Sequence, residues 1–222
     1  MVLSLLKAAC RGRNINLIMP ALLLIIMMSC NTHRHNDSLP FYNTADFTAE
    51  WITNDAAPIH TIDSFSMVNQ QGHIFNSDSL KGKIYVACFF FTSCGSICPK
   101  MMFNIKKLQD SFSLEDKVRI VSFSVMPSVD SVGKLAAYGK NMGIDPAKWM
   151  LLTGDKARIN TLGRQSFFAE KKEGLQKDAN EFMHTETMLL IDKKARIRGV
   201  YNATEPGDIA RASEDIRILL KE

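Results

Sequence analysis

The stretch from Ile84 to Phe91 is the feature that most constrains the fold of this chain of 222 residues. It is continuously apolar and has the length of one strand, and a strand without a polar side must be covered on both faces of its sheet. Cys94 and Cys98 follow at its C-terminal end, before residues 97–112, which carry apolar side chains at helical spacing. The sequence therefore predicts a buried strand, a cysteine loop and a helix in succession.

The two cysteines stand four residues apart, which turns both side chains toward one side of a helix. If the helix begins near Ile97, the partial positive charge of its N-terminus favours thiolate over thiol. Their Cα separation also suits a disulfide. Thiolates bind soft metals and attack disulfides, so the spacing leaves two interpretations open: an oxidised pair, or a metal site.

Further strands and helices alternate along the chain, which is typical of an α/β domain with a mixed sheet and helices on both faces. The first two strands form an N-terminal pair around the turn Asn69–Gly72, and the chain closes with a hairpin and a helix. The other strands are predicted at 118–125, 149–152, 187–191 and 197–201, and the helices at 97–112, 131–142, 155–168 and 207–220. Open α/β sheets commonly bind ligands at the C-terminal ends of central strands, where the cysteine loop lies.

The N-terminus, residues 1–29, has the pattern of an export signal of the lipoprotein type. Basic residues precede a short apolar run, and Ser29 precedes Cys30, which would be acylated after cleavage. The alternative is an uncleaved signal anchor in which Cys30 is incidental. Either reading places the domain in the cell envelope, attached to the membrane and facing the periplasm.

Residues 30–58 are predicted to be a tether and an N-terminal extension, and residues 59–222 the folded domain. Aromatic residues are expected to pack the extension onto that domain: Phe41, Tyr42, Phe47 and Trp51. Removing residues 1–29 lowers the formal net charge from +4 to +1, so the mature chain offers no basic surface for nucleic acid. The third cysteine of the domain, Cys88, is predicted to be an inert thiol in the central strand.

His184 is the candidate third ligand, because it stands just before the predicted strand at 187–191. In a thioredoxin-like layout this strand neighbours the one at 84–91, which would bring His184 toward the cysteine loop. Two thiolates and one imidazole suit Cu(I), and Cu(II) with a weak extra ligand, whereas structural zinc usually takes four protein ligands. The alternative is that His184 is an ordinary loop histidine.

Four motifs in order resemble the SCO/SenC family of copper chaperones, which are membrane-anchored thioredoxin-like domains. The resemblance covers about residues 59–220. It rests on Phe-Thr-Ser-Cys94-Gly-Ser-Ile-Cys98-Pro, on Ser124-Val-Met126-Pro-Ser-Val-Asp130, on Trp149 to Gly154, and on His184 ahead of Leu189 to Asp192. Met126 departs from the first Asp of the family's second motif, while Asp130 keeps the second.

The resemblance implies that Cys94, Cys98 and His184 bind one copper ion, as Cu(I), Cu(II) or both in turn. It implies delivery of copper to a cytochrome c oxidase subunit. Reduction of an acceptor's disulfide to thiols by the same cysteine pair is compatible with this delivery. Asp130 would belong to an acidic partner-docking loop, a role that Met126 puts in doubt. The competing interpretation is a periplasmic thiol–disulfide oxidoreductase without a physiological metal, in which Cys94 and Cys98 form the redox-active disulfide.

Overall fold

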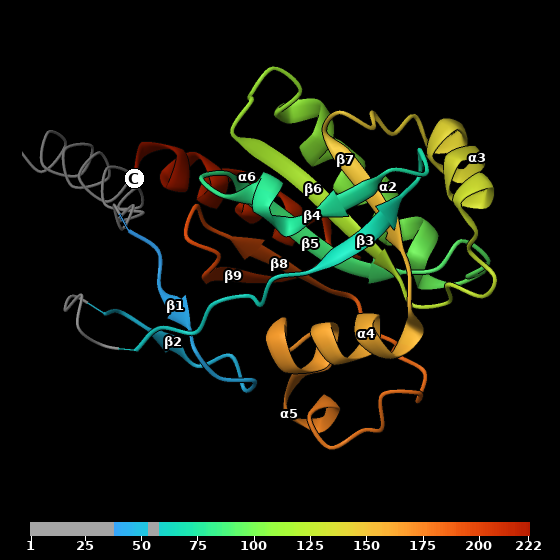
Figure 1. The fold of residues 1–222 in the computed structure, drawn as a ribbon. Helices are drawn as coiled ribbons and strands as arrows, with labels where there is room; N and C mark the ends of the chain where they lie inside the picture. The colour runs from blue at the N-terminus through green and yellow to red at the C-terminus, as the bar shows by residue number, and fades with distance from the viewer. Residues whose placement is uncertain (1–37, 53–57) are drawn as a thin grey trace, which may run out of the picture. The chain divides into compact units, whose positions relative to one another are not determined.

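The computed structural model describes residues 38–52 and 58–222 and contains a mixed sheet of seven strands (Figure 1). Its strands lie in the order β4-β3-β7-β6-β5-β8-β9. They are β3 (Ser66–Asn69), β4 (Ile74–Asn76), β5 (Ile84–Phe90), β6 (Val118–Ser124), β7 (Trp149–Thr153), β8 (Thr187–Ile191) and β9 (Ile197–Asn202). The pairs β5–β6 and β6–β7 are parallel and the other pairs are antiparallel, so the predicted mixed sheet is confirmed.

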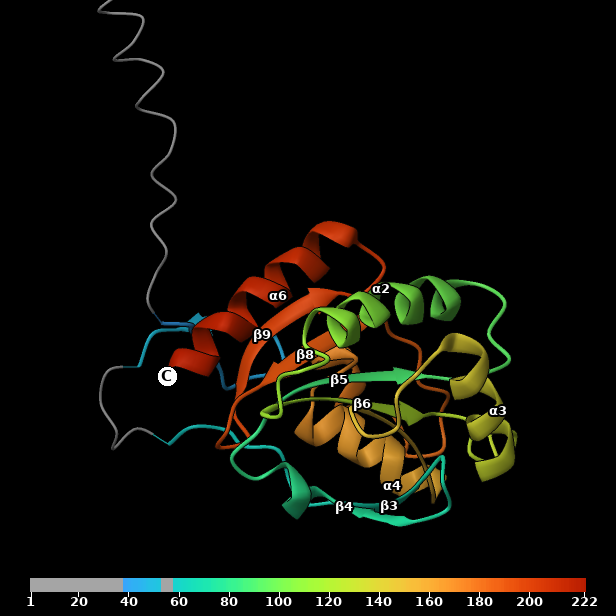
Figure 2. The same cartoon turned by 90° about the horizontal axis from the view of Figure 1, so that it is seen from above.

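Helices cover both faces of this sheet, as predicted. Figure 2 shows α2 and α6 on one side and α4 on the other. The helices are α2 (Ile97–Ser111), α3 (Val132–Met142), α4 (Lys156–Thr161), α5 (Lys171–Gly174) and α6 (Pro206–Lys221). A 3₁₀ turn, η1 (Ser77–Leu80), precedes β5, and a π-helical turn, η2 (Leu162–Ser166), continues α4.

Strand β5 is buried along its whole length, because each of its faces joins a separate hydrophobic cluster. Val86, Cys88 and Phe90 pack with α2 and α6, while Tyr85, Ala87 and Phe89 pack on the opposite side. Burial raises the pKa of Cys88 to about 12, and its Sγ lies 3.1 Å from the hydroxyl of Ser122. This environment agrees with the prediction of a core thiol.

The described part of the predicted N-terminal extension forms a small antiparallel pair, β1 (Phe41–Tyr42) and β2 (Ala49–Glu50). The guanidinium of Arg198 donates to the carbonyls of Leu39 and Pro40 at 2.7 and 3.0 Å and lies 4.3 Å from the ring centre of Phe41. Trp51 does not pack as predicted, since 58% of it is exposed.

The predicted signal at 1–29, Cys30 and the start of the tether lie outside the described residues. Among residues 38–52 and 58–222, no helix is long and apolar enough to span a bilayer.

One predicted helix, 155–168, is wrong in detail, because α4 gives way to the π turn η2 after Thr161. Gly163 in this turn packs so closely that an added Cβ would lie 2.5 Å from Cε of Met183 and 2.8 Å from Cε1 of Phe89. These are contacts with distant segments. The widened turn therefore depends on tertiary packing that the local helical pattern does not contain.

Candidate metal centre

Cys94 and Cys98 lie together where β5 passes into α2. Helix α2 begins at Ile97, as the sequence predicts, so Cys98 stands in its first turn. Both are free thiols; Cys94 is partly exposed, whereas 4% of Cys98 is exposed. Each cysteine side chain shifts the pKa of the other, so the two thiols are close neighbours at the end of the central strand.

The two thiols differ in acidity. Burial raises the pKa of Cys94, but the backbone N–H groups of Ser96, Ile97 and Cys98 and the side chain of Cys98 outweigh it, so the net pKa lies below its usual value. Burial raises the pKa of Cys98 to about 12, and the neighbouring Cys94 adds to the effect. Cys94 is therefore the accessible and more acidic thiol, and Cys98 is the buried partner that holds its proton more tightly.

Asp130 anchors the start of the cysteine loop from inside the protein. Its carboxylate accepts hydrogen bonds from the N–H and hydroxyl of Thr92, at 3.0 and 2.5 Å, and from the hydroxyl of Ser124 at 2.6 Å. The ammonium of Lys134 lies 3.8 Å away. Asp130 is 0% exposed, so it does not present the docking surface expected for it; in this structure it positions the loop.

Tyr138 on α3 is a neighbour of the thiols that the sequence reasoning missed. Its ring centre lies 5.7 Å from that of Phe90. Burial raises the pKa of its phenol, and the charges of Cys98, Cys88 and Cys94 raise it further, so the phenol lies within electrostatic range of the thiols. The sequence does not single out this tyrosine, because an aromatic residue at helical spacing is expected to be an ordinary packing residue.

His184 lies on the segment that leads into β8, at the same end of the sheet as the cysteine loop. Strands β5 and β8 are neighbours, as predicted, and they pair antiparallel with Cys88 opposite Met188. The start of β8 therefore lies beside the end of β5. Two residues before His184, the ring of Phe182 contacts that of Phe91, with centres 5.4 Å apart.

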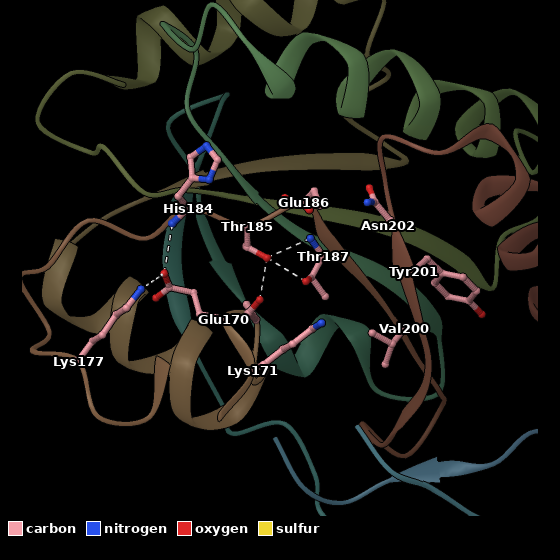
Figure 3. A pocket seen from close by; sticks show the side chains of 11 residues that line it. Glu170, Lys171, Lys177, His184, Thr185, Glu186, Thr187, Val200, Tyr201 and Asn202 are labelled. Carbon is pink, nitrogen blue, oxygen red and sulfur yellow. Dashed lines mark hydrogen bonds and ion pairs between the residues drawn. The ribbon is translucent and has the colours of Figure 1, made fainter. Parts of the chain in front are cut away.

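The imidazole itself is exposed and points away from the Glu170 carboxylate, whereas the His184 backbone faces it (Figure 3). In the part of the chain that the structure describes, no three His, Cys, Asp or Glu side chains are placed to hold one metal ion. The structure thus joins Cys94 and Cys98 and leaves His184 on the adjoining loop. Its role as third ligand stays a prediction.

A pocket of about 360 Å³ lies beside His184, between the α5–β8 segment and β9 (Figure 3). Its walls include Glu170, Lys171 and Lys177 but neither cysteine. Since it holds no thiol, this pocket is not the candidate copper site. The methionines near the site in sequence are core residues with exposed fractions of 0 to 1%: Met101, Met102, Met183 and Met188.

Comparison with known proteins connects this geometry to one family. The family model described as SCO1/SenC matches residues 53–221. The SCO1 protein homolog of Bacillus subtilis is 31% identical over 150 residues, covering 66% of this chain and 76% of that protein. The SCO2-like protein of Rickettsia felis is 29% identical over 152 residues, covering 65% and 71%.

Solved structures agree with the sequence relatives. A SCO1/SenC family lipoprotein from Bacillus anthracis superposes with a TM-score of 0.64 and 29% identity, covering 75% of this chain and 98% of that one. BsSco, described as a Sco-family cytochrome c oxidase assembly protein with a disulfide switch, gives 0.61 and 28%, covering 75% and 96%. Copper-bound ScoI of Bradyrhizobium japonicum gives 0.56 and 25%, covering 72% and 99%. These likenesses confirm the expected thioredoxin-like fold.

Proposed function

The chain belongs to the SCO1/SenC family, and from this premise we propose that it is a copper chaperone that supplies cytochrome c oxidase during assembly. The observation that carries the proposal is the pair of free thiols at the N-terminus of α2, one exposed and one buried. The copper-bound ScoI relative and the assembly role named for BsSco support it. One copper ion per chain would be held by Cys94, Cys98 and His184.

Copper is cargo in this proposal, so its site must both capture and release the ion. The Cys94 thiol is accessible and has a lowered pKa, and both cysteines give up their protons when copper binds, since only the deprotonated sulfur is a ligand. His184 completes the set from the adjoining loop. An incoming acceptor thiolate would replace one ligand at a time at the exposed Cys94 side, which passes the ion on without a free intermediate.

The place of action follows from the N-terminal sequence. We propose that the chain is anchored through acylated Cys30 and that its domain faces the periplasm. The lipoprotein from Bacillus anthracis supports this. Mass spectrometry of the mature N-terminus checks it: a diacylglyceryl Cys30 is expected, and an unmodified chain beginning at Met1 would contradict it.

A second candidate function is reduction of acceptor disulfides, which the contrast in exposure between the two thiols favours. Cys94 thiolate would attack the acceptor disulfide and release one acceptor thiolate. Cys98 would then attack the mixed disulfide, which releases the second thiolate and leaves a Cys94–Cys98 disulfide. The disulfide switch named for BsSco supports this chemistry.

Metal titration of the reduced protein separates the two functions. Under anaerobic conditions we expect one tightly bound Cu(I) per chain, and we expect His184→Ala to weaken Cu(II) binding by about 100-fold while changing Cu(I) binding little. Disulfide reduction that proceeds at the same rate with and without copper, together with Cu(II) binding that His184→Ala leaves unaltered, would favour the oxidoreductase instead.

A further inference from the structure

The loop that carries His184 is held by side chains rather than by backbone pairing. Residues 175–186, between α5 and β8, form no helix or strand. Irregular backbone needs other partners for its carbonyl groups, because an unpaired buried carbonyl is costly. Three side chains from α4 and η2 supply them: Lys156, Asn160 and Arg164.

These three donors share one side of the helix, since they are spaced four residues apart. The wider π turn that contains Arg164 offsets the angular drift that this spacing produces in a regular α-helix. Together they reach four successive carbonyl groups. Lys156 donates to Asn180 at 2.8 Å, Asn160 to Ala179 at 2.7 Å and Glu181 at 3.0 Å, and Arg164 to Asp178 at 2.5 Å and Glu181 at 3.0 Å.

A buried ion pair connects the same arginine to the backbone of His184. Arg164 is 2% exposed, and its Nε donates to a carboxylate oxygen of Glu170 at 2.6 Å. The other oxygen of Glu170 accepts from Lys177 at 2.7 Å and from the N–H of His184 at 3.4 Å (Figure 3). A buried charge stays stable when it is paired and hydrogen-bonded in this way.

We propose that Lys156, Asn160, Arg164 and Glu170 form a clamp that positions His184 for copper. The clamp fixes the chain up to Glu181, and strand β8 fixes it from Thr187, so residues 182–186 are the short segment that carries the imidazole. The buried side chain of Met183, 1% exposed, restrains this segment further. The proposal rests on the copper function proposed above, because it concerns the third ligand of that site.

The clamp would act mainly on Cu(II). Two thiolates satisfy Cu(I), whereas Cu(II) prefers additional ligands and binds imidazole well. A loop ordered before the metal arrives loses less conformational entropy when His184 becomes a ligand. The clamp would thereby set how strongly the protein prefers one oxidation state of copper over the other. A purely structural role for these residues would change stability without changing that preference.

Three variants test the clamp. Arg164→Met removes both carbonyl contacts and the ion pair, and Lys156→Met removes one contact from a partly exposed position that folding tolerates more readily. Arg164→Lys keeps the charge beside Glu170 but lacks the guanidinium fork that reaches two carbonyls. Lys140→Met, an exposed lysine on α3, is the matched control. His184→Ala is measured beside them.

We expect Cu(II) affinity to fall by about 10-fold or more in Arg164→Met, less in Lys156→Met and Arg164→Lys, and not in Lys140→Met. Cu(I) affinity should stay within about threefold in all four, since Cys94 and Cys98 are intact. In the metal-free proteins, amide hydrogen exchange at residues 178–184 should accelerate in the clamp variants and stay unchanged in the control.

The outcomes separate this proposal from the proposed function. If His184→Ala weakens Cu(II) binding while the folded clamp variants bind it normally, the clamp is overturned and the ligand set stands. Equal losses of Cu(I) and Cu(II) affinity would also overturn the clamp, because they indicate general damage. If His184→Ala binds Cu(II) normally, the proposed ligand fails, and clamp variants whose loop exchange is also unchanged would reject the clamp itself.

Discussion

The cysteine loop and the His184 loop leave neighbouring strands at the same edge of the sheet, yet they are held in different ways. The cysteine loop lies between β5 and α2, is anchored by Asp130 through Thr92, and carries two thiols that shift each other's pKa. The His184 loop has no regular structure and depends on side chains from α4 and η2 and on Glu170, which precedes α5. The cysteine half of the candidate site is thus built into the fold, whereas the His184 half lies on an irregular loop next to it.

This difference suggests that the two halves of the site have separate roles in copper binding and release. Preformed thiols give a permanent capture point for soft metal, whereas an imidazole on a short segment can join or leave the ligand set. A chaperone has to release its cargo, so a site with one adjustable ligand suits delivery better than a closed one. The predictions below test each half.

Removing a thiol of the pair should have the largest effect. Cys94→Ser or Cys98→Ser leaves one thiolate, and we expect the tight binding of both Cu(I) and Cu(II) to be lost in a titration. Cys88→Ala is the matched control, since it removes a thiol from the same core and should cost about 1 kcal/mol of stability while sparing copper binding. If either serine variant still binds copper tightly, the copper site is not the Cys94–Cys98 pair.

The acidity difference inside the pair should appear as selective alkylation. A group with a lowered pKa loses its proton at lower pH, so Cys94 reacts as thiolate at pH values where Cys98 is still protonated. Because the pKa of Cys94 lies below its usual value and burial raises the pKa of Cys98 to about 12, the ratio of thiolate on Cys94 to thiolate on Cys98 is well above one at neutral pH.

Iodoacetamide labelling of the reduced, metal-free protein followed by peptide mass spectrometry measures this ratio across pH. Labelling of Cys94 should fall only as the solution is acidified below the pKa of that residue. Equal labelling of the two, or earlier labelling of Cys98, would show that the loop does not fix the pair as described.

Asp130→Ala should destabilise the cysteine loop, which is the half of the site that is built into the fold. It leaves three donors on Thr92 and Ser124 without their acceptor, which should cost about 2–4 kcal/mol in the free energy of unfolding, measured in urea. Asp116→Ala, whose carboxylate is 95% exposed, should cost about 0.5 kcal/mol or less. Similar small losses in both variants would mean that Asp130 does not anchor the loop.

The sequence predicts the built-in half well, because its signals are local. The unbroken apolar run locates β5, and the spacing after it locates the start of α2 at Ile97. The sequence contains the recognisable motif that ends in Asp130, but it does not predict which way the Asp130 carboxylate points. A carboxylate after a strand can face solvent or the neighbouring loop. Burial and the hydroxyls of Thr92 and Ser124 decide that, and both come from the folded structure.

The other half was only partly predictable. The strand order that brings β8 beside β5 followed from the expected fold. The clamp could not be predicted, because its acceptors are backbone carbonyl groups. Every residue has such a group, so no sequence pattern identifies the ones that are used. The π turn at η2 likewise depends on Gly163 fitting against Met183 and Phe89. The pair β1–β2 is too short to show strand alternation.

X-ray absorption spectroscopy of the copper-loaded domain tests the central claim most directly, because it counts the ligand atoms around the ion. For Cu(II), we expect two sulfur atoms and at least one imidazole nitrogen in the wild-type protein, and loss of that imidazole signal in His184→Ala. An imidazole signal that persists in this variant, or a wild-type site without sulfur, would contradict the account.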